Sequence, residues 1–151
     1  MRKPLVSIDP GVDYCACAWW MPGVDLDDYP GSPALRGVKI VQRKDWGKLL
    51  GGGPDIAIIE RPVIYRHGKA KTKDVEGLLI ASGEIASHFQ QVVWFTPRVW
   101  KGQQPKAAHQ KKIIAACNEN ELAICEGLAK KDLKHIWDAV GLGLYYLGRL
   151  S

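Results

Sequence analysis

Residues 6–20, VSIDPGVDYCACAWW, combine two apolar runs with an aspartate and a Pro-Gly pair between them. Runs of this kind on either side of a tight turn predict a β-hairpin, with one strand over residues 4–9 and the other over residues 13–20. The first strand ends at Asp9, and an ionised carboxylate beside a buried strand costs several kcal/mol to desolvate unless it is paired. Asp9 therefore needs a partner, which can be a helix N-terminus, an arginine or a metal ion.

A second apolar run also ends in an acidic residue. Residues 55–60, DIAIIE, form a short isoleucine-rich segment that is typical of a strand buried on both faces, and Glu60 is its last residue. If this strand lies parallel to the first one and beside it, the two carboxylates emerge at the same edge of the sheet. Sites of α/β proteins lie at that edge.

The remaining pattern predicts an α/β protein. We expect a loop over residues 21–37, because this segment is rich in Pro, Gly and Asp. Two more strands are expected: 38–42 and 92–96. Helices are expected in three ranges: 75–89, 105–117 with Pro105 in the first turn, and 132–150 with Asp132 as N-cap. A single helical turn is also expected within residues 44–50, before the Gly-rich segment GGGPD. This order gives a mixed five-stranded sheet flanked by helices, in one domain over residues 1–151.

The last predicted helix contains the sequence HIWDAVGLGLYY. His135 and Asp138 are three residues apart, so they share one face of the helix. Three small residues allow this helix to lie close to the sheet: Ala139, Gly141 and Gly143. We therefore expect His135 and Asp138 to meet Asp9 and Glu60 in one pocket.

Three ionised carboxylates cannot crowd together without a cation, because like charges repel each other. A pair of Mg²⁺ or Mn²⁺ ions satisfies them, since hard ions prefer oxygen ligands, and two such ions suit phosphodiester hydrolysis. Each residue also has a simpler explanation. Asp9 can pin the Pro-Gly turn, and Glu60 can pair with Arg61. Asp138 can hydrogen-bond to the sheet, and His135 can be an ordinary satisfied helix residue.

The basic residues are concentrated in two stretches without acidic residues, although the net charge is only +5. Residues 61–73 contain Arg61, Arg66, Lys69, Lys71 and Lys73. Residues 85–118 contain Arg98, Lys101, Lys106, Lys111 and Lys112. Such stretches indicate a polyanionic partner, most commonly nucleic acid, with an ordinary solvated surface as the alternative. Trp94, Trp100 and Trp137 can stack on bases, but core packing is favoured for most of them.

The four cysteines include no C-x-x-C pair, which disfavours a zinc site and indicates buried, reduced thiols in a cytoplasmic protein. No apolar run approaches the roughly 18 residues of a membrane span. The apolar stretch near the N-terminus is too short for a secretory signal.

Four segments in order resemble the RuvC family of Holliday junction resolvases. SIDPG resembles the family's first strand and its aspartate, and AIIE resembles the strand with its glutamate. TPRVWKGQQPKAAHQKK is similar to the family's basic stretch before a helix, and HIWDA resembles the acidic motif of its final helix. The resemblance covers nearly the whole chain and implies the ribonuclease H-like fold.

The resemblance also implies an activity. Asp9, Glu60, His135 and Asp138 would be the catalytic and metal-binding residues, with Mg²⁺ or Mn²⁺, two ions per site. Lys101 and Lys106 would approach the scissile phosphate, and the other basic residues of the two stretches would hold DNA. The protein would be a homodimer that nicks two strands of a four-way junction symmetrically and leaves 5′-phosphate ends.

The chain departs from the family at three places. Many members have aspartate where His135 stands; an imidazole suits Mn²⁺, or it can orient or deprotonate the attacking water. Val63 stands where the family often has a junction-opening aromatic residue, and Tyr65 is the candidate substitute. The segment VDLDDYPGSPALRG is longer and more acidic than expected. These departures favour a phage-type member that acts on a broader range of branched DNA, and the resemblance implies the cytoplasm of a bacterium or of a phage-infected host cell.

Three other classes of protein share part of this pattern. A non-catalytic junction-binding protein of the same fold would be expected to lose some of the acidic residues, whereas this chain keeps them. Actin-like ATPases also begin with a strand, Asp and Gly, but they need two domains. A ribonuclease H-like nuclease that acts on RNA–DNA hybrids or on tRNA-like RNA is an alternative that the sequence does not exclude.

Overall fold

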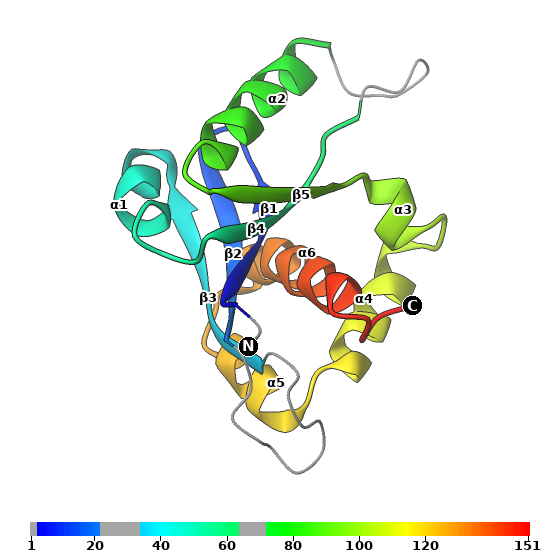
Figure 1. Cartoon of the computed structure of the whole chain (residues 1–151). Helices are drawn as coiled ribbons and strands as arrows, with labels where there is room; N and C mark the ends of the chain where they lie inside the picture. The colour runs from blue at the N-terminus through cyan, green and yellow to red at the C-terminus, as the bar shows by residue number, and fades with distance from the viewer. Residues whose placement is uncertain (1–2, 22–33, 64–71) are drawn as a thin grey trace.

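The computed structural model describes residues 3–21, 34–63 and 72–151, and a five-stranded sheet forms its centre (Figure 1). The strands are β1 (Leu5–Pro10), β2 (Tyr14–Met21), β3 (Ala34–Gln42), β4 (Ile56–Glu60) and β5 (Gln91–Phe95). Their order in the sheet is β3-β2-β1-β4-β5. The pairs β1–β2 and β2–β3 are antiparallel, whereas β1–β4 and β4–β5 are parallel. The predicted mixed sheet is confirmed, as is the parallel pairing of the two strands that carry Asp9 and Glu60 at their ends.

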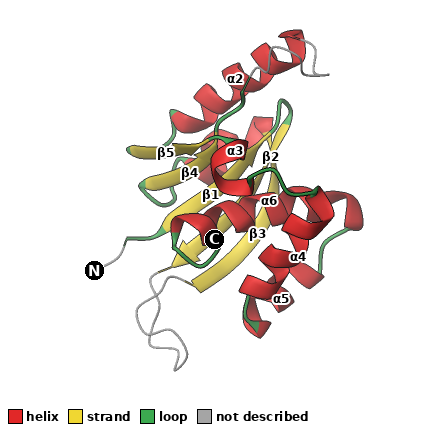
Figure 2. Ribbon diagram, turned by 90° about the vertical axis from the view of Figure 1, so that its right-hand side faces the viewer, coloured by secondary structure: helices red, strands yellow, loops and turns green. Residues whose placement is uncertain are grey.

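Helices cover both faces of this sheet (Figure 2). They are the short η1 (Arg43–Asp45), α1 (Trp46–Leu50), α2 (Thr72–Ala86), α3 (Pro97–Lys101), α4 (Lys106–Ala116), α5 (Glu119–Glu126) and α6 (Lys130–Tyr146). One core cluster joins α1 and α2 to one face of the sheet, and a second joins α4, α5 and α6 to the other. No described helix has the length and apolar character that a membrane span requires.

Alternation along the strands decides which face each side chain takes. On β1, Val6 and Ile8 are fully buried in the cluster with α2, so Ser7 and Asp9 point to the α6 face. On β4, Ile59 belongs to the α2 cluster and Ile58 to the α6 cluster. Glu60 therefore takes the α6 face as well, and the two acidic strand ends share it.

Ser7 fixes α6 against the sheet. Its hydroxyl is fully buried, donates to the carbonyl of Ala139 at 2.6 Å and accepts the indole N–H of Trp20 at 2.9 Å. Gly143 faces the same indole so closely that a Cβ would clash with it. The predicted close approach of the helix is thus confirmed for Ala139 and Gly143. Gly141 instead faces Ile113 of α4.

Several predicted boundaries are wrong. Asp132 is not the N-cap of α6: Ala129 is, because the N–H of Asp132 already donates to the Ala129 carbonyl at 2.9 Å. The helix also ends earlier, at Tyr146, because Gly148 takes the left-handed conformation (φ 74°) that terminates helices. Pro105 is the N-cap of α4 rather than a first-turn residue.

Two helices and part of a strand were not predicted. Residues 34–37, expected in a loop, begin β3 and pair with β2. α3 has only five residues, too few for a periodic apolar pattern. α5 follows a capping box in which Asn118 accepts from the Glu121 N–H and the Glu121 side chain accepts from the Asn118 N–H.

Candidate active site

The site begins with the two carboxylates at the ends of β1 and β4. Ile8 pairs with Ile59 in the parallel register, so the next residues, Asp9 and Glu60, stand on neighbouring strands at the carboxyl edge of the sheet. Their side chains are 13% and 15% exposed, respectively. Arg61, the ion-pair partner that the sequence suggests for Glu60, is exposed, and Glu60 pairs with Lys101 instead. Both carboxylates instead find partners on helices.

α6 supplies the partner of Asp9. His135 Nδ1 lies 3.3 Å from Asp9 Oδ2. His135 Nε2 lies 3.2 Å from the hydroxyl of Tyr14, whose ring packs edge-on against the imidazole with the ring centroids 5.6 Å apart. Because a tyrosine hydroxyl can donate or accept, Tyr14 satisfies Nε2 in either tautomer of His135. The nitrogen that faces the carboxylates is Nδ1.

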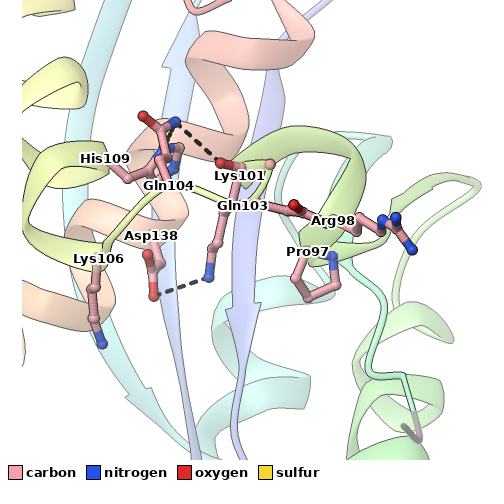
Figure 3. Close-up of a pocket in the computed structure, with 9 residues that line it drawn as sticks. Pro97, Arg98, Lys101, Gln103, Gln104, Lys106, His109 and Asp138 are labelled. Atoms are coloured by element: carbon pink, nitrogen blue, oxygen red, sulfur yellow. Dashed lines mark hydrogen bonds and ion pairs between the residues drawn. The ribbon is translucent and has the colours of Figure 1, made fainter.

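Lys101 joins the other two carboxylates. Its Nζ lies 3.0 Å from Glu60 Oε2 and 3.4 Å from Asp138 Oδ2, and Figure 3 shows it turned toward Asp138. The lysine ends α3, which begins at Pro97 directly after Thr96 as N-cap. The sequence pattern predicts that Lys101 belongs to a DNA-binding stretch. It does not predict that Lys101 lies inside the acidic cluster, which consists of Asp9, Glu60 and Asp138.

The cluster holds one ammonium group against three carboxylates. Burial raises the pKa of Asp9; the hydrogen bond with His135 opposes this rise, and the charge of Asp138 adds to it. Burial likewise raises the pKa of Glu60, against the effect of Lys101. Burial alone would lower the pKa of Lys101, but the charges of Glu60 and Asp138 outweigh it and the pKa lies above its usual value. Lys101 therefore stays protonated, and its ammonium lies among three carboxyl groups.

The donor chemistry of the cluster fits a divalent cation. Carboxylate oxygens are the ligands that Mg²⁺ and Mn²⁺ prefer, and an imidazole extends the set toward Mn²⁺. Within the described ranges, no three side chains of His, Cys, Asp or Glu lie close enough together to hold a metal ion as they stand. The ammonium of Lys101 lies between Glu60 and Asp138, within 3.4 Å of both carboxylates.

Trp100 is a residue of the site that sequence reasoning missed. Its indole N–H donates to Glu60 Oε2 at 2.8 Å, and its side chain is buried, as is that of Trp137. Core packing is thus confirmed for these two tryptophans, whereas Trp94 is 39% exposed. The signal available in the sequence was the need of every buried indole N–H for an acceptor.

Comparisons with known proteins place the fold. Neither a family model nor a curated protein matches the sequence. Solved structures match over nearly the whole chain. The fold is that of the Holliday junction resolvases. RuvC of Thermus thermophilus in complex with a Holliday junction substrate aligns at 14% identity and a TM-score of 0.58, covering 98% of both chains.

Two further resolvases have a similar fold. The fowlpox virus Holliday junction resolvase aligns at 18% identity and a TM-score of 0.58, over 97% of this chain and 99% of its own. The yeast mitochondrial resolvase Ydc2 aligns at 9% identity and a TM-score of 0.58, over 96% of this chain and 80% of its own. The ribonuclease H-like fold predicted from the resemblance is confirmed.

A pocket of about 400 Å³ opens beside the acidic cluster of this resolvase fold (Figure 3). Asp138 and Lys101 belong to its wall, together with Arg98, Lys106 and His109. The pocket thus joins the carboxylates to part of the second basic stretch. Its mixed charge suits a phosphate group held by cations next to an acidic centre.

The predicted DNA-binding residues fall into three groups. The exposed ones are Arg61, Lys73, Arg98, Lys106, Lys111 and Lys112. Lys101 is the exception, because it is paired with carboxylates. Four others lie outside the described residues: Tyr65, Arg66, Lys69 and Lys71. Contact of any of them with DNA stays a prediction.

Proposed function

We propose that this protein is a metal-dependent endonuclease that resolves four-way or other branched DNA by paired nicks. The observation that carries the proposal is the meeting of two strand-end carboxylates with a histidine and an aspartate of α6, on the fold of the Holliday junction resolvases. An acidic cluster at the carboxyl edge of the sheet, beside a pocket with cationic walls, suits the hydrolysis of a phosphodiester.

Asp9, Glu60, His135 and Asp138 would hold the divalent ions. A pair of ions bound there would supply an activated water and would stabilise the leaving oxygen. The chain's own residues set where this happens, because Ser7 fixes α6 and thereby the position of its two ligands over β1. His135 presents Nδ1 to the cluster, either as a ligand or as the acceptor of a proton from water, while Tyr14 holds Nε2.

Basic side chains outside the cluster would hold the phosphate backbone. Arg98 and Lys106 border the pocket, and Lys111 and Lys112 continue along α4 on the exposed surface. Contacts of this kind position DNA without reading its sequence. Shape would then decide the substrate, which is consistent with action on branched molecules.

A cleavage assay with four substrates tests the proposal. Purified protein with Mg²⁺ or Mn²⁺ is given a synthetic four-way junction, a flap, a linear duplex and an RNA–DNA hybrid. We expect paired nicks in the junction, with 5′-phosphate ends. Asp9→Asn should abolish cleavage and retain junction binding. Asp13→Asn, the same change on the exposed hairpin turn, should cut like the wild type.

Other outcomes would support the competing classes. Preferential cutting of the hybrid would indicate a ribonuclease H-like nuclease with another substrate. Tight junction binding without cutting, together with no heat of Mn²⁺ binding in calorimetry, would indicate a junction-binding protein. Normal cutting by Asp9→Asn would show that the site is assigned wrongly.

Paired nicks need two active sites, so the proposal includes a homodimer. α2 and β5 expose Leu79, Ile80 and Trp94 beside a pocket of about 340 Å³ that Arg61 also lines. A second copy of the chain that covers this face would bury these apolar side chains. Sedimentation should show a dimer for the wild type and a monomer for Ile80→Asp. A wild type that stays monomeric at assay concentrations would contradict the homodimer.

A further inference from the structure

We infer that Trp100 is a positioning residue that fixes the carboxylate of Glu60 through its indole N–H. The inference rests on the proposed function, in which Glu60 holds a cation. It concerns how protein donors hold one oxygen of that carboxylate, so that the other oxygen stays available to a cation.

The hydrogen bonds that Glu60 receives from the described residues fall on a single oxygen. Trp100 Nε1 donates to Oε2 at 2.8 Å, and Lys101 Nζ lies 3.0 Å from the same atom. Oε1 receives no hydrogen bond from the residues that the structure describes. A carboxylate with one oxygen held by protein donors has a fixed rotamer and a defined direction for its remaining lone pairs.

The two donors differ in charge, and this difference assigns the role to Trp100. Lys101 carries a full positive charge, so another cation near Glu60 repels it and competes for the same oxygen. An indole N–H is neutral and can only donate, so it keeps its bond to the carboxylate whichever cation is present. Trp100 also guides the lysine, whose Nζ lies 4.8 Å from the centre of the indole ring.

The surroundings of Trp100 hold the indole in place. Its ring lies against Gly141 of α6, where a Cβ would come within 2.9 Å of Trp100 Cζ3. On another side, His109 packs edge-on against the indole, with the ring centroids 5.0 Å apart and the planes at 63°. Trp100 is 4% exposed, so it has little room for another rotamer.

Gln104 fixes the tautomer of the supporting histidine. Its Nε2 donates to the carbonyl of Lys101 at 3.1 Å, which sets the orientation of the amide, and it lies 2.9 Å from His109 Nδ1. Nδ1 must then accept, and the proton of the ring stays on Nε2. Burial, aided by the charge of Lys101, lowers the pKa of His109, so the ring beside Trp100 is neutral and adds no charge that would displace the lysine.

The hydrogen bond can be tested without any activity measurement. The chain has six tryptophans, so a ¹⁵N–¹H spectrum of the full-length protein shows separate indole signals that can be assigned by triple-resonance experiments. Glu60→Gln should shift the indole signal of Trp100. It should leave that of Trp46 in place, because Trp46 Nε1 donates to the Val41 carbonyl at 3.1 Å in the other core cluster. An unmoved Trp100 signal would overturn the inference.

The effect on the reaction is tested with a matched pair of variants. Trp100→Phe and Trp46→Phe each remove one buried indole N–H, one beside Glu60 and one far from it. Under single-turnover conditions with Mg²⁺, we expect Trp100→Phe to cut the junction about 10- to 100-fold more slowly, as is typical when a partner of a metal ligand is lost. Its affinity for the junction should be unchanged, and Trp46→Phe should cut like the wild type.

Failure of this inference differs from failure of the proposed function. If the wild type cuts the junction, Glu60→Gln does not, and Trp100→Phe matches Trp46→Phe in rate, then Trp100 is not a positioning residue although the function stands. If the wild type cuts no branched DNA, the proposed function fails, and the spectrum still reports whether Trp100 holds Glu60.

Discussion

Replacing Lys101 by methionine removes the positive charge inside the acidic cluster. The ammonium lies 3.0 Å from Glu60 and 3.4 Å from Asp138, and the three side chains are 26%, 15% and 17% exposed, in that order. In Lys101→Met the three carboxylates repel one another with no internal cation. A divalent metal ion would no longer have to compete with the lysine.

The size of the effect follows from the burial of the pair. Removing one partner of a fully buried ion pair costs about 3–5 kcal/mol, and exposed pairs contribute about 0–1 kcal/mol. For these partly exposed groups we expect Lys101→Met to lower the free energy of unfolding by about 1–3 kcal/mol in EDTA, or the melting temperature by roughly 2–12 °C. A metal present at 100 times its Kd adds about 2.7 kcal/mol, which is enough to restore most of this loss.

Thermal melts in EDTA and in a series of Mg²⁺ concentrations measure both effects. Lys106→Met is the control, because Lys106 is exposed on the rim of the same pocket. We expect Lys101→Met to melt below the control in EDTA and to gain more from Mg²⁺ than the wild type does. Two results would refute the hypothesis that Lys101 acts as the internal cation of the cluster. One is an equal melting temperature of the two variants in EDTA, and the other is a smaller rise of the melting temperature with Mg²⁺ in Lys101→Met than in the wild type.

Three further predictions concern stability and DNA binding. Gly143→Ala should destabilise the protein by about 1–3 kcal/mol in urea unfolding, since the methyl group overlaps an indole of β2, whereas Gly83→Ala, with open space around it in α2, should be neutral or stabilising. Burial opposes ionisation of Glu121, but the hydrogen bonds from Arg149 at 2.7 and 2.8 Å prevail and hold the pKa of Glu121 below its usual value of 4.5. The stability from this pair is therefore complete above pH 4.5 and is lost as the pH falls through the lower folded-state pKa. Accordingly, Arg149→Met should cost about 3–5 kcal/mol at pH 7 and less in acid, and a pH-independent cost would contradict this account. Lys106→Ala should weaken junction binding and reduce the salt dependence of log K by about one counterion, and an unchanged slope would exclude a phosphate contact.

The sheet was predictable because strands have a period of two. Alternation places Asp9 and Glu60 on the same face once their strands are parallel neighbours, and the hairpin and the isoleucine-rich run indicate both strands. His135 and Asp138 follow from helical spacing in the same way. The ends of α6 were not predictable to the residue, because Ala129 has no side chain that marks an N-cap and Gly148 stops the helix by its backbone conformation.

The place of Lys101 was not predictable, and the reason lies in its neighbour. A lysine in a stretch without acidic residues normally indicates a solvated or DNA-binding side chain, and nothing in the local sequence separates Lys101 from Lys106. The structure separates them through Trp100, which is buried and bonded to Glu60, a residue 40 positions away in the sequence. Because the lysine follows this indole and lies over its ring, the burial of Trp100 turns Lys101 inward toward the carboxylates. The acceptor of a buried indole N–H therefore predicts the position of such a lysine better than the charge pattern of its stretch does. In this chain the acceptor of the Trp100 N–H is Glu60, and Lys101 is the cation that lies beside Glu60.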